Sequence, residues 1–243
     1  GAVFAFFHAY ASINMKANQT ISGTALNMFA PAFAIFVARV IQGVQQIQFN
    51  NTFRIESVPL LGSIPFFGPL LFQNTYITTY LGVAILILST LVLYRTRFGL
   101  RLRSCGEHPQ AADSVGINVY RMRYAGVLIS GVLGGLGGIV YIIAGVSEWK
   151  FENGVAGFGF LALAVMIFGQ WKPTRIALAA LLFGFFRALG NVYSGFDLLS
   201  NLNLPSSVYN MLPYVISLVV LAFTSQKSRA PKAEGIPYDK GQR

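Results

Sequence analysis

The side chains best suited to catalysis or metal binding are few in this sequence. His8 and His108 are its two histidines and Cys105 is its one cysteine, and their spacing matches no metal-binding pattern. A lone cysteine of this kind is typically an inert thiol. Gly157 to Ala162 fits the dinucleotide pattern G-x-G-x-x-A, but it opens an apolar helix and follows no strand–helix unit, so we treat it as chance. The chain has no Gly-x4-Gly-Lys-Ser/Thr loop, and the sequence predicts that it neither hydrolyses ATP nor uses a cofactor.

The segment from Arg95 to Arg123 is the most specific feature of the chain. Pro109 and the Gln-Ala-Ala-Asp run after it predict a short helix that begins at the proline. Gly116 is placed to end that helix. The flanking arginines can meet anionic lipid headgroups or an acidic partner surface. The segment is either a basic loop that only fixes topology or a helix along the membrane whose small residues dock another protein, and we favour the second interpretation.

Closely spaced glycines mark one apolar stretch. Gly131 with Gly135, and Gly134 with Gly138, form two overlapping G-x-x-x-G pairs. Such pairs let a neighbouring helix approach closely and gain dispersion contacts inside a membrane. We predict tight helix packing here, with the alternative that this contact surface slides during transport.

The elements that must position these segments are long apolar stretches. Apolar residues make up 54% of the chain and charged residues 11%, against roughly 25% charged residues in ordinary globular proteins. This composition excludes disorder, and the stretches lack the alternation of β-barrel strands and the polar face of soluble helices. The stretches are Thr20 to Ala38, Tyr76 to Tyr94, Tyr124 to Ser147, Asn153 to Trp171, Ile176 to Gly190 and Val208 to Thr224. The sequence therefore predicts an all-α, polytopic transmembrane helix bundle.

Two further stretches are apolar but do not fit a complete span. Gly1 to Ile13 would reach only about 20 Å as a helix, short of a bilayer of roughly 30 Å. We expect Gly1 to fall inside a helix of a longer protein, so that the chain lacks helices at its N-terminal side. The connection from Asn50 to Thr75 carries Pro59, Pro65 and Pro69, which predicts an irregular outer loop that is surface-packed or partly re-entrant.

The basic residues indicate the orientation in the membrane. The net charge is +10, from 18 Lys and Arg against 8 Asp and Glu. Lys16, the segment 95–123, the turn 172–175 and the tail after Ser225 fall on one side and carry the whole excess. The positive-inside rule makes that side cytoplasmic. The charge is thus a topology signal, and nucleic acid is not needed as a partner to explain it.

At this point the chain resembles a known family. The run TRFGLRLRSCGEHPQAADSVGI from Thr96 to Ile117, followed by SGVLGGLGG from Ser130, is similar to the coupling-loop signature of ABC importer permeases. It most resembles the nucleoside and simple-sugar branch of the ribose and branched-chain amino acid permease superfamily. Lys16 to Asn27 resembles the same branch, with ALNMFAP leaning toward its nucleoside members. The match runs from Gly1 to about Phe223, and family members carry further helices before the equivalent of Gly1.

The resemblance implies partners and a mechanism. A second permease, identical or homologous, would supply the other half of the path, ABC ATPase subunits would bind the cytoplasmic face, and an extracytoplasmic binding protein or lipoprotein would deliver substrate. The ATPase-coupling residues would be Gly106, Glu107, Pro109, Ala111, Ala112 and Gly116. ATP-driven closure would reach the spanning helices through a rigid contact at this coupling helix.

A nucleoside substrate would require amides, hydroxyls and aromatic rings along its path. The candidates are Gln19, Asn27, Asn191 and Tyr193. Each polar side chain has the alternative role of hydrogen-bonding a neighbouring helix. Arg187 lies within a span, and we expect Asp197 or Glu152 to pair with it.

We therefore predict a transmembrane permease domain over residues 1–225, with a coupling loop at 95–123 and a flexible cytoplasmic tail at 226–243. The expected function is the inward passage of nucleosides or related simple sugars across a bacterial-type cell membrane, with ATP hydrolysis by separate subunits. The alternative is an ion-coupled secondary transporter, which commonly uses carboxylates or histidines within its spans. A membrane enzyme would need clustered histidines or acids at one interface, and the sequence has no such cluster.

Overall fold

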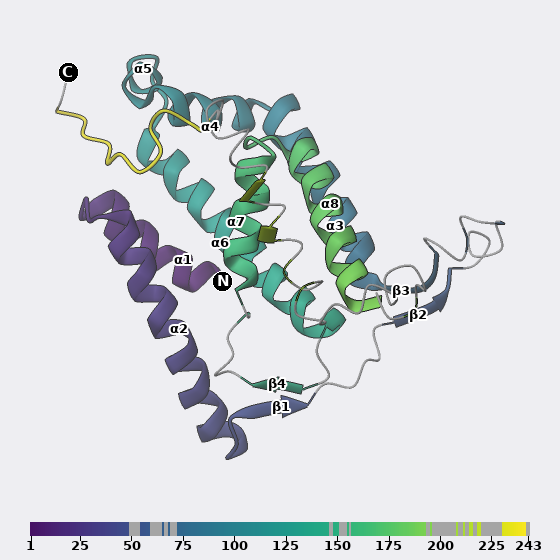
Figure 1. The fold of residues 1–243 in the computed structure, drawn as a ribbon. Coiled ribbons are helices and arrows are strands. Elements are labelled where there is room, and N and C mark those ends of the chain that lie inside the picture. The colour runs from purple at the N-terminus through teal and green to yellow at the C-terminus, as the bar shows by residue number, and fades with distance from the viewer. Residues whose placement is uncertain are drawn as a thin grey trace. The chain divides into compact units, whose positions relative to one another are not determined.

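The computed structural model describes residues 1–48, 54–58, 72–145, 148–150, 157–192 and 230–241, with a few single positions between these ranges. The chain divides into two compact units, residues 1–156 with 232–243, and residues 157–231. Helices dominate both units (Figure 1). Each unit is described in turn.

The first unit opens with two helices joined by a tight connection. Helix α1 (Ala2–Ala9) continues into a π-helical turn, η1 (Tyr10–Asn14), and α2 spans Gln19–Gln42. The Asn18 side chain caps α2 by accepting hydrogen bonds from the backbone N–H groups of the next turn, and Gly43 ends it in the left-handed conformation. Phe4 of α1 packs against two phenylalanines of α2 with ring centres 6.0 Å apart. Aromatic contacts therefore join α1 and α2.

The segment predicted as the coupling loop, residues 95–123, begins at the last residue of one helix and contains two more. The three helices are α3 (Ile77–Arg95), α4 (Arg97–Glu107) and α5 (Pro109–Ser114), and α6 follows over Val119–Gly145. Figure 1 shows α4 and α5 at one end of α3 and α6. The predicted loop is thus largely helical.

The close helix contact predicted from the glycines is present, and it uses one of the two glycine pairs. Helix α1 crosses α6 at Gly131 and Gly135, where an added Cβ on Gly131 would collide with the Cβ of Ala5. Around Gly134 and Gly138 no described atom lies within 4 Å of an added Cβ. The prediction of tight packing is therefore confirmed for the pair Gly131–Gly135.

Two small antiparallel strand pairs lie at the other end of these helices. Strand β1 (Gln46–Gln48) pairs with β4 (Glu148–Lys150) and brings the ends of α2 and α6 together. Strand β2 (Arg54–Ser57) pairs with β3 (Gln73–Tyr76), just before α3. The connection expected to be irregular thus has paired ends, while most of its proline-rich centre lies outside the described residues.

The second unit contains a helical hairpin. Helix α7 spans Phe158–Phe168 and α8 spans Pro173–Val192. Val165, Ala179 and Phe183 form its small buried core. The tight turn brings Gly169 so close to Ile176 that a Cβ on Gly169 would overlap with it. This turn fixes the two helices against each other.

Among the described residues, four helices are long and apolar enough to cross a membrane: α2, α3, α6 and α8. These correspond to four of the predicted spans, so the all-α polytopic fold is confirmed. Helix α7 is shorter than the predicted stretch from Asn153 to Trp171, because Gly157 precedes it with φ 79° and it ends before the positive φ values of Gln170 and Trp171. The predicted stretch Val208 to Thr224 lies mostly outside the described residues.

Candidate functional site

Helix α4 is held across the end of α3 by a sharp turn. Thr96 caps α4 by accepting a hydrogen bond from the Gly99 N–H at 3.1 Å, and its hydroxyl donates to the Val92 carbonyl at 2.6 Å. A Cβ on Gly99 would collide with the backbone at Val92 and Leu93. Only glycine permits this close crossing, so the sequence places α4 locally and rigidly.

Helix α5 has the boundaries that the sequence predicts. Pro109 occupies its first turn, and Gly116 adopts φ 84° just after its end. The N–H of Gly116 donates to the Asp113 carbonyl at 2.9 Å, and the N–H of Ile117 donates to the Ala112 carbonyl at 3.1 Å. These bonds satisfy carbonyls that the helix end leaves free. The prediction of a Pro-started, Gly-ended helix is confirmed.

The six predicted coupling residues divide into two groups. Glu107, Ala111 and Gly116 are exposed and Gly106 is half-buried. Pro109 and Ala112 are buried, with Ala112 only 3% exposed. Sequence reasoning treated both alanines as outward-facing, and for Ala112 this was wrong. Neighbouring residues of a helix point in different directions, so Ala112 turns toward the helices beneath while Ala111 points away from them. Ala112 therefore anchors α5, while Ala111 faces outward.

Beneath α5 lies a small buried group of four side chains, here called the anchor cluster: Cys105, Ala112, Val119 and Tyr238. Cys105 is 3% exposed, and burial raises the pKa of its thiol above the ordinary value of 9.0. The thiol is thus kept protonated and shielded. The anchor cluster joins α4, α5 and α6 to the end of the described chain.

The segment that contributes Tyr238, residues 232–241, lay in the region predicted to be a flexible tail. In the structure the Tyr238 ring packs edge-on against Tyr120 with centres 5.5 Å apart. Burial, followed by a hydrogen bond to Asp113, raises the pKa of the Tyr238 hydroxyl above its usual value. Sequence reasoning missed this contact, although one aromatic residue in a polar, proline-containing segment was a signal for it.

Backbone contacts hold the same segment on both sides of Tyr238. The Ala233 N–H donates to the Gly106 carbonyl at 2.9 Å. The Arg123 guanidinium donates to the Ile236 carbonyl at 2.9 Å and lies 5.9 Å from the centre of the Tyr238 ring. The segment is therefore attached to α4 and α6 as well as to α5.

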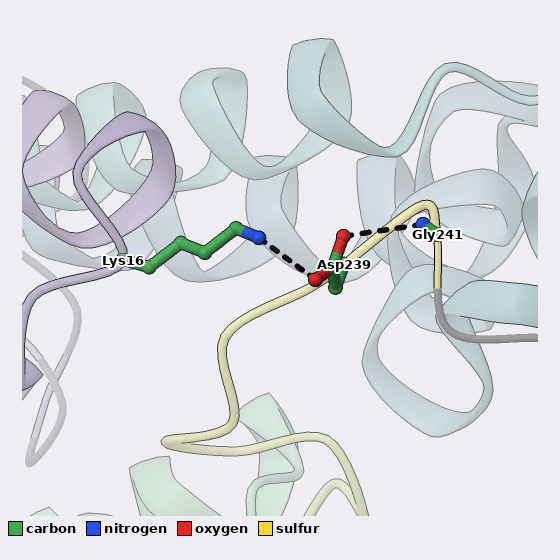
Figure 2. Close-up of polar contacts among 3 residues, drawn as sticks. All are labelled: Lys16, Asp239 and Gly241. Atoms are coloured by element: carbon green, nitrogen blue, oxygen red, sulfur yellow. Dashed lines mark hydrogen bonds and ion pairs between the residues drawn. The ribbon is translucent and has the colours of Figure 1, made fainter.

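An ion pair connects this segment to the connection before α2. Lys16 Nζ lies 2.8 Å from Asp239 Oδ2, and the Gly241 N–H donates to Asp239 Oδ1 at 3.1 Å (Figure 2). The hydrogen bond between the two side chains raises the pKa of Lys16 and lowers that of Asp239. Because both side chains are well exposed, this pair orients the segment more than it stabilises the fold.

Exposed arginines surround the site. Arg97, Arg101, Arg103 and Arg121 are all exposed, and the Arg103 guanidinium lies 4.8 Å from the centre of the Tyr94 ring. A cation held over an aromatic ring beside an apolar helix end is suited to the membrane interface. The site thus combines an outward-facing short helix with a positive rim.

Asn27 is the predicted substrate-path residue with the most informative surroundings. It lies within α2, its side chain is exposed, and Pro31 follows four residues later in the same helix. Proline has no N–H, so the Asn27 carbonyl lacks its normal helical donor. Sequence reasoning noted each residue but missed this spacing, which removes one helical donor from the Asn27 carbonyl.

The other predicted path residues lie in different surroundings. Gln19 is the half-buried first residue of α2. Asn191 is exposed near the end of α8 in the second unit, and Tyr193 lies outside the described residues. Gln19 and Asn27 therefore share a helix, while Asn191 belongs to another unit.

Arg187 has an aromatic neighbour in the second unit. Its guanidinium lies 4.2 Å from the centre of the Phe158 ring. Its predicted partners, Asp197 and Glu152, are outside the described residues. The contact with Phe158 is a cation–π interaction between α8 and α7.

Among the described residues, no three His, Cys, Asp or Glu side chains come together as metal ligands. His8 instead lies 3.0 Å from the Ser22 hydroxyl, which links α1 to α2. The Tyr124 hydroxyl of α6 donates to the Asn14 side chain at 2.6 Å. Asn14 and Tyr124 also line an open pocket of about 550 Å³ beside the start of α6.

Comparison with known proteins gives a consistent result. Residues 1–221 match the family described as branched-chain amino acid transport system / permease component. The chain is 46% identical to the nucleoside ABC transporter permease protein NupC of Lactococcus lactis over 240 residues, which are 99% of this chain and 75% of that protein. It is 42% identical to the guanosine ABC transporter permease protein NupQ of Bacillus subtilis over 244 residues, covering 100% of this chain and 76% of that protein. A second Lactococcus lactis protein, the nucleoside ABC transporter permease protein NupB, is 24% identical over 156 residues, covering 64% of this chain and 41% of that protein. No solved structure matches the chain.

Proposed function

This chain belongs to the family of branched-chain amino acid transport permease components, and from that premise we propose that it is the membrane-spanning permease subunit of an ATP-driven importer of nucleosides. The observation that supports the substrate is the whole-chain similarity to two permeases named for nucleosides and guanosine. The chain is a multi-pass membrane protein that moves a solute and makes no covalent bond. ATP hydrolysis belongs to separate subunits.

The partners follow from this function. ABC ATPase subunits bind the end of the molecule that carries α4 and α5, which the positive-inside rule assigns to the cytoplasm. A second permease completes the path, as the presence of two nucleoside permeases in Lactococcus lactis suggests. A binding protein delivers substrate at the opposite end, where β1 pairs with β4.

Helix α5 is the contact through which the ATPase drives the permease. Glu107, Ala111 and Gly116 face outward and form its docking surface, with Gly106 beside them. Pro109 and Ala112 face inward and hold the helix on α4 and α6. Because α5 is packed beneath and free above, a displacement of the ATPase moves α5 as a rigid piece and switches the helices between two packed states.

Asn27 is the substrate-path residue that the structure favours most. Its amide donates and accepts hydrogen bonds, and its backbone carbonyl lacks the N–H that residue 31 would otherwise supply. A neutral, polar nucleoside needs both kinds of group within an otherwise apolar span. Gln19, Asn191 and Tyr193 remain further candidates for the path.

The docking role is tested by the substitution Ala111→Trp in the assembled importer. We expect the indole to prevent close seating of α5, so that the ATPase no longer co-purifies with the permease and uptake of labelled guanosine is lost. The matched control is Leu88→Trp, an exposed site midway along α3. Normal uptake and a bound ATPase in Ala111→Trp would exclude docking at α5.

A further inference from the structure

We infer that residues 232–241 form a strut that ties the docking helix α5 to α6 and to the connection before α2, with Tyr238 as its positioning residue. The inference rests on the proposed function and adds a part to it. Through this strut, movement of α5 reaches α2, the helix that carries Asn27.

Tyr238 connects the strut to α5 and α6. Its side chain is 5% exposed and belongs to the anchor cluster with Ala112 of α5 and Val119 of α6. The Tyr120 ring lies edge-on to the Tyr238 ring, with the two ring centres 5.5 Å apart. A single side chain thus contacts both helices, so the position of α5 on α6 depends on it.

Lys16 and Asp239 connect the strut to the segment before α2. Lys16 lies between η1 and α2, and its 2.8 Å contact with Asp239 is the one ion pair found in the described part of the chain (Figure 2). Asp239 directly follows Tyr238, so the anchor and the ion pair are adjacent. Because Tyr238 packs with α5 and Asp239 pairs with Lys16 in the connection before α2, the two adjacent residues link α5 to that connection.

The strut leaves the docking surface open. Ala233 binds the Gly106 carbonyl and Tyr238 lies beneath α5, while Gln110, Ala111 and Ser114 stay exposed. A segment that blocked the ATPase would cover these outward residues instead. The geometry therefore fits transmission of movement and does not fit inhibition.

Because the ion pair is exposed, variants of Lys16 and Asp239 can change the transmission of movement from α5 without changing the stability of the fold. Lys16 and Asp239 side chains are 46% and 39% exposed, and exposed pairs contribute little to folding. Reversing one charge therefore leaves the fold intact while it releases the strut from α2. The ion pair thus supplies variants that test transmission without a change of fold.

The experiment uses the complete importer, with its ATPase, second permease and binding protein, reconstituted in vesicles. Labelled guanosine uptake and ATP hydrolysis are measured together for Tyr238→Ala, Tyr238→Phe, Lys16→Glu, Asp239→Lys and the double charge reversal. We expect uptake per ATP to fall between about 2-fold and 30-fold in Tyr238→Ala and in each single reversal. Tyr238→Phe, which keeps the ring, and the double reversal should both return toward the unmodified ratio.

The sole cysteine reports independently whether the strut is docked. Cys105 is buried beside Tyr238, so a maleimide should label it slowly in the unmodified importer and in Tyr238→Phe, and faster in Tyr238→Ala. If labelling of Cys105 stays slow in Tyr238→Ala, Tyr238 does not hold the segment in place and the strut is excluded. If labelling becomes faster while uptake per ATP is unchanged, the segment does not transmit movement and the strut is also excluded. The same holds if the double reversal is no better than the single ones. Absence of guanosine uptake by the unmodified importer would instead contradict the proposed substrate.

Discussion

At the scale of single residues, Pro31 changes what Asn27 offers. A polar side chain in a membrane span usually hydrogen-bonds a neighbouring helix, and that alternative was open for Asn27 from the sequence. Pro31 has no N–H, so the backbone carbonyl of Asn27 lacks the donor that a helix normally supplies to it. A second polar group at the same point favours a substrate contact, because a helix partner would have to satisfy both.

The substitution Asn27→Leu tests this residue. It removes the amide and keeps a similar size, and the loss of one or two neutral hydrogen bonds should raise the KM for guanosine by about 2-fold to 10-fold. ATPase binding should not change, because α5 is untouched. The control is Met28→Leu, an exposed neighbour on the same helix. An unchanged KM in Asn27→Leu would remove Asn27 from the path.

Residue roles on α5 were only partly predictable from the sequence. Pro109 and Gly116 act through their own backbone restrictions, so their positions at the start and after the end of the helix could be predicted. The opposite roles of Ala111 and Ala112 could not, because the facing of a six-residue helix is decided by what packs beneath it. Here the partners are Cys105, Val119 and Tyr238, and the last of these is more than one hundred residues away.

At the scale of elements, α1 and α6 illustrate how a glycine motif selects a face. The two G-x-x-x-G pairs of α6 are equivalent in sequence, yet α1 contacts only Gly131 and Gly135 among the described atoms. A small-residue pair permits close approach from either face. The choice depends on a partner helix, so it is a tertiary property that the sequence pattern leaves undecided.

This selection predicts opposite effects for two matched substitutions in the isolated chain. Gly131→Ala places a methyl group against Ala5 and should destabilise the fold by about 1 to 3 kcal/mol through overpacking. Gly134→Ala meets open space and should be neutral or stabilise by up to about 1 kcal/mol, because alanine restricts the unfolded chain. Thermal unfolding of the two variants in detergent measures the difference. Equal unfolding temperatures would show that α1 does not cross α6 at Gly131.

At the scale of the whole molecule, the helices of the first unit have the coupling segment at one end and the small strand pairs at the other. Lys16, the helices α4 and α5 and the strut lie together, and the strand pairs lie at the opposite ends of α2, α3 and α6 (Figure 1). The sequence predicted this separation from charge alone, because loop charge sets orientation. It did not predict that residues 232–241 pack beneath α5. The segment is rich in polar residues and contains proline, and this composition is typical of an exposed tail, although Tyr238 is buried.

An ATP-driven importer and an ion-coupled transporter differ in the source of energy that drives uptake. An ion-coupled transporter commonly carries acidic residues or histidines within its spans, and α2, α3, α6 and α8 contain no Asp, Glu or His among their described residues. The family and the relatives instead point to ATP. The resemblance drawn from the coupling segment is confirmed at the level of the family.

The most direct test of the account is uptake of labelled guanosine into vesicles that contain the complete importer, with the binding protein outside and ATP inside. We predict that uptake requires internal ATP, continues when ionophores collapse the proton and sodium gradients, and is competed by unlabelled uridine or adenosine but not by ribose. Competition by ribose alone would make the substrate a sugar. Uptake that proceeds without ATP and stops when the ion gradients collapse would contradict the central claim that this chain is the permease of an ATP-driven importer.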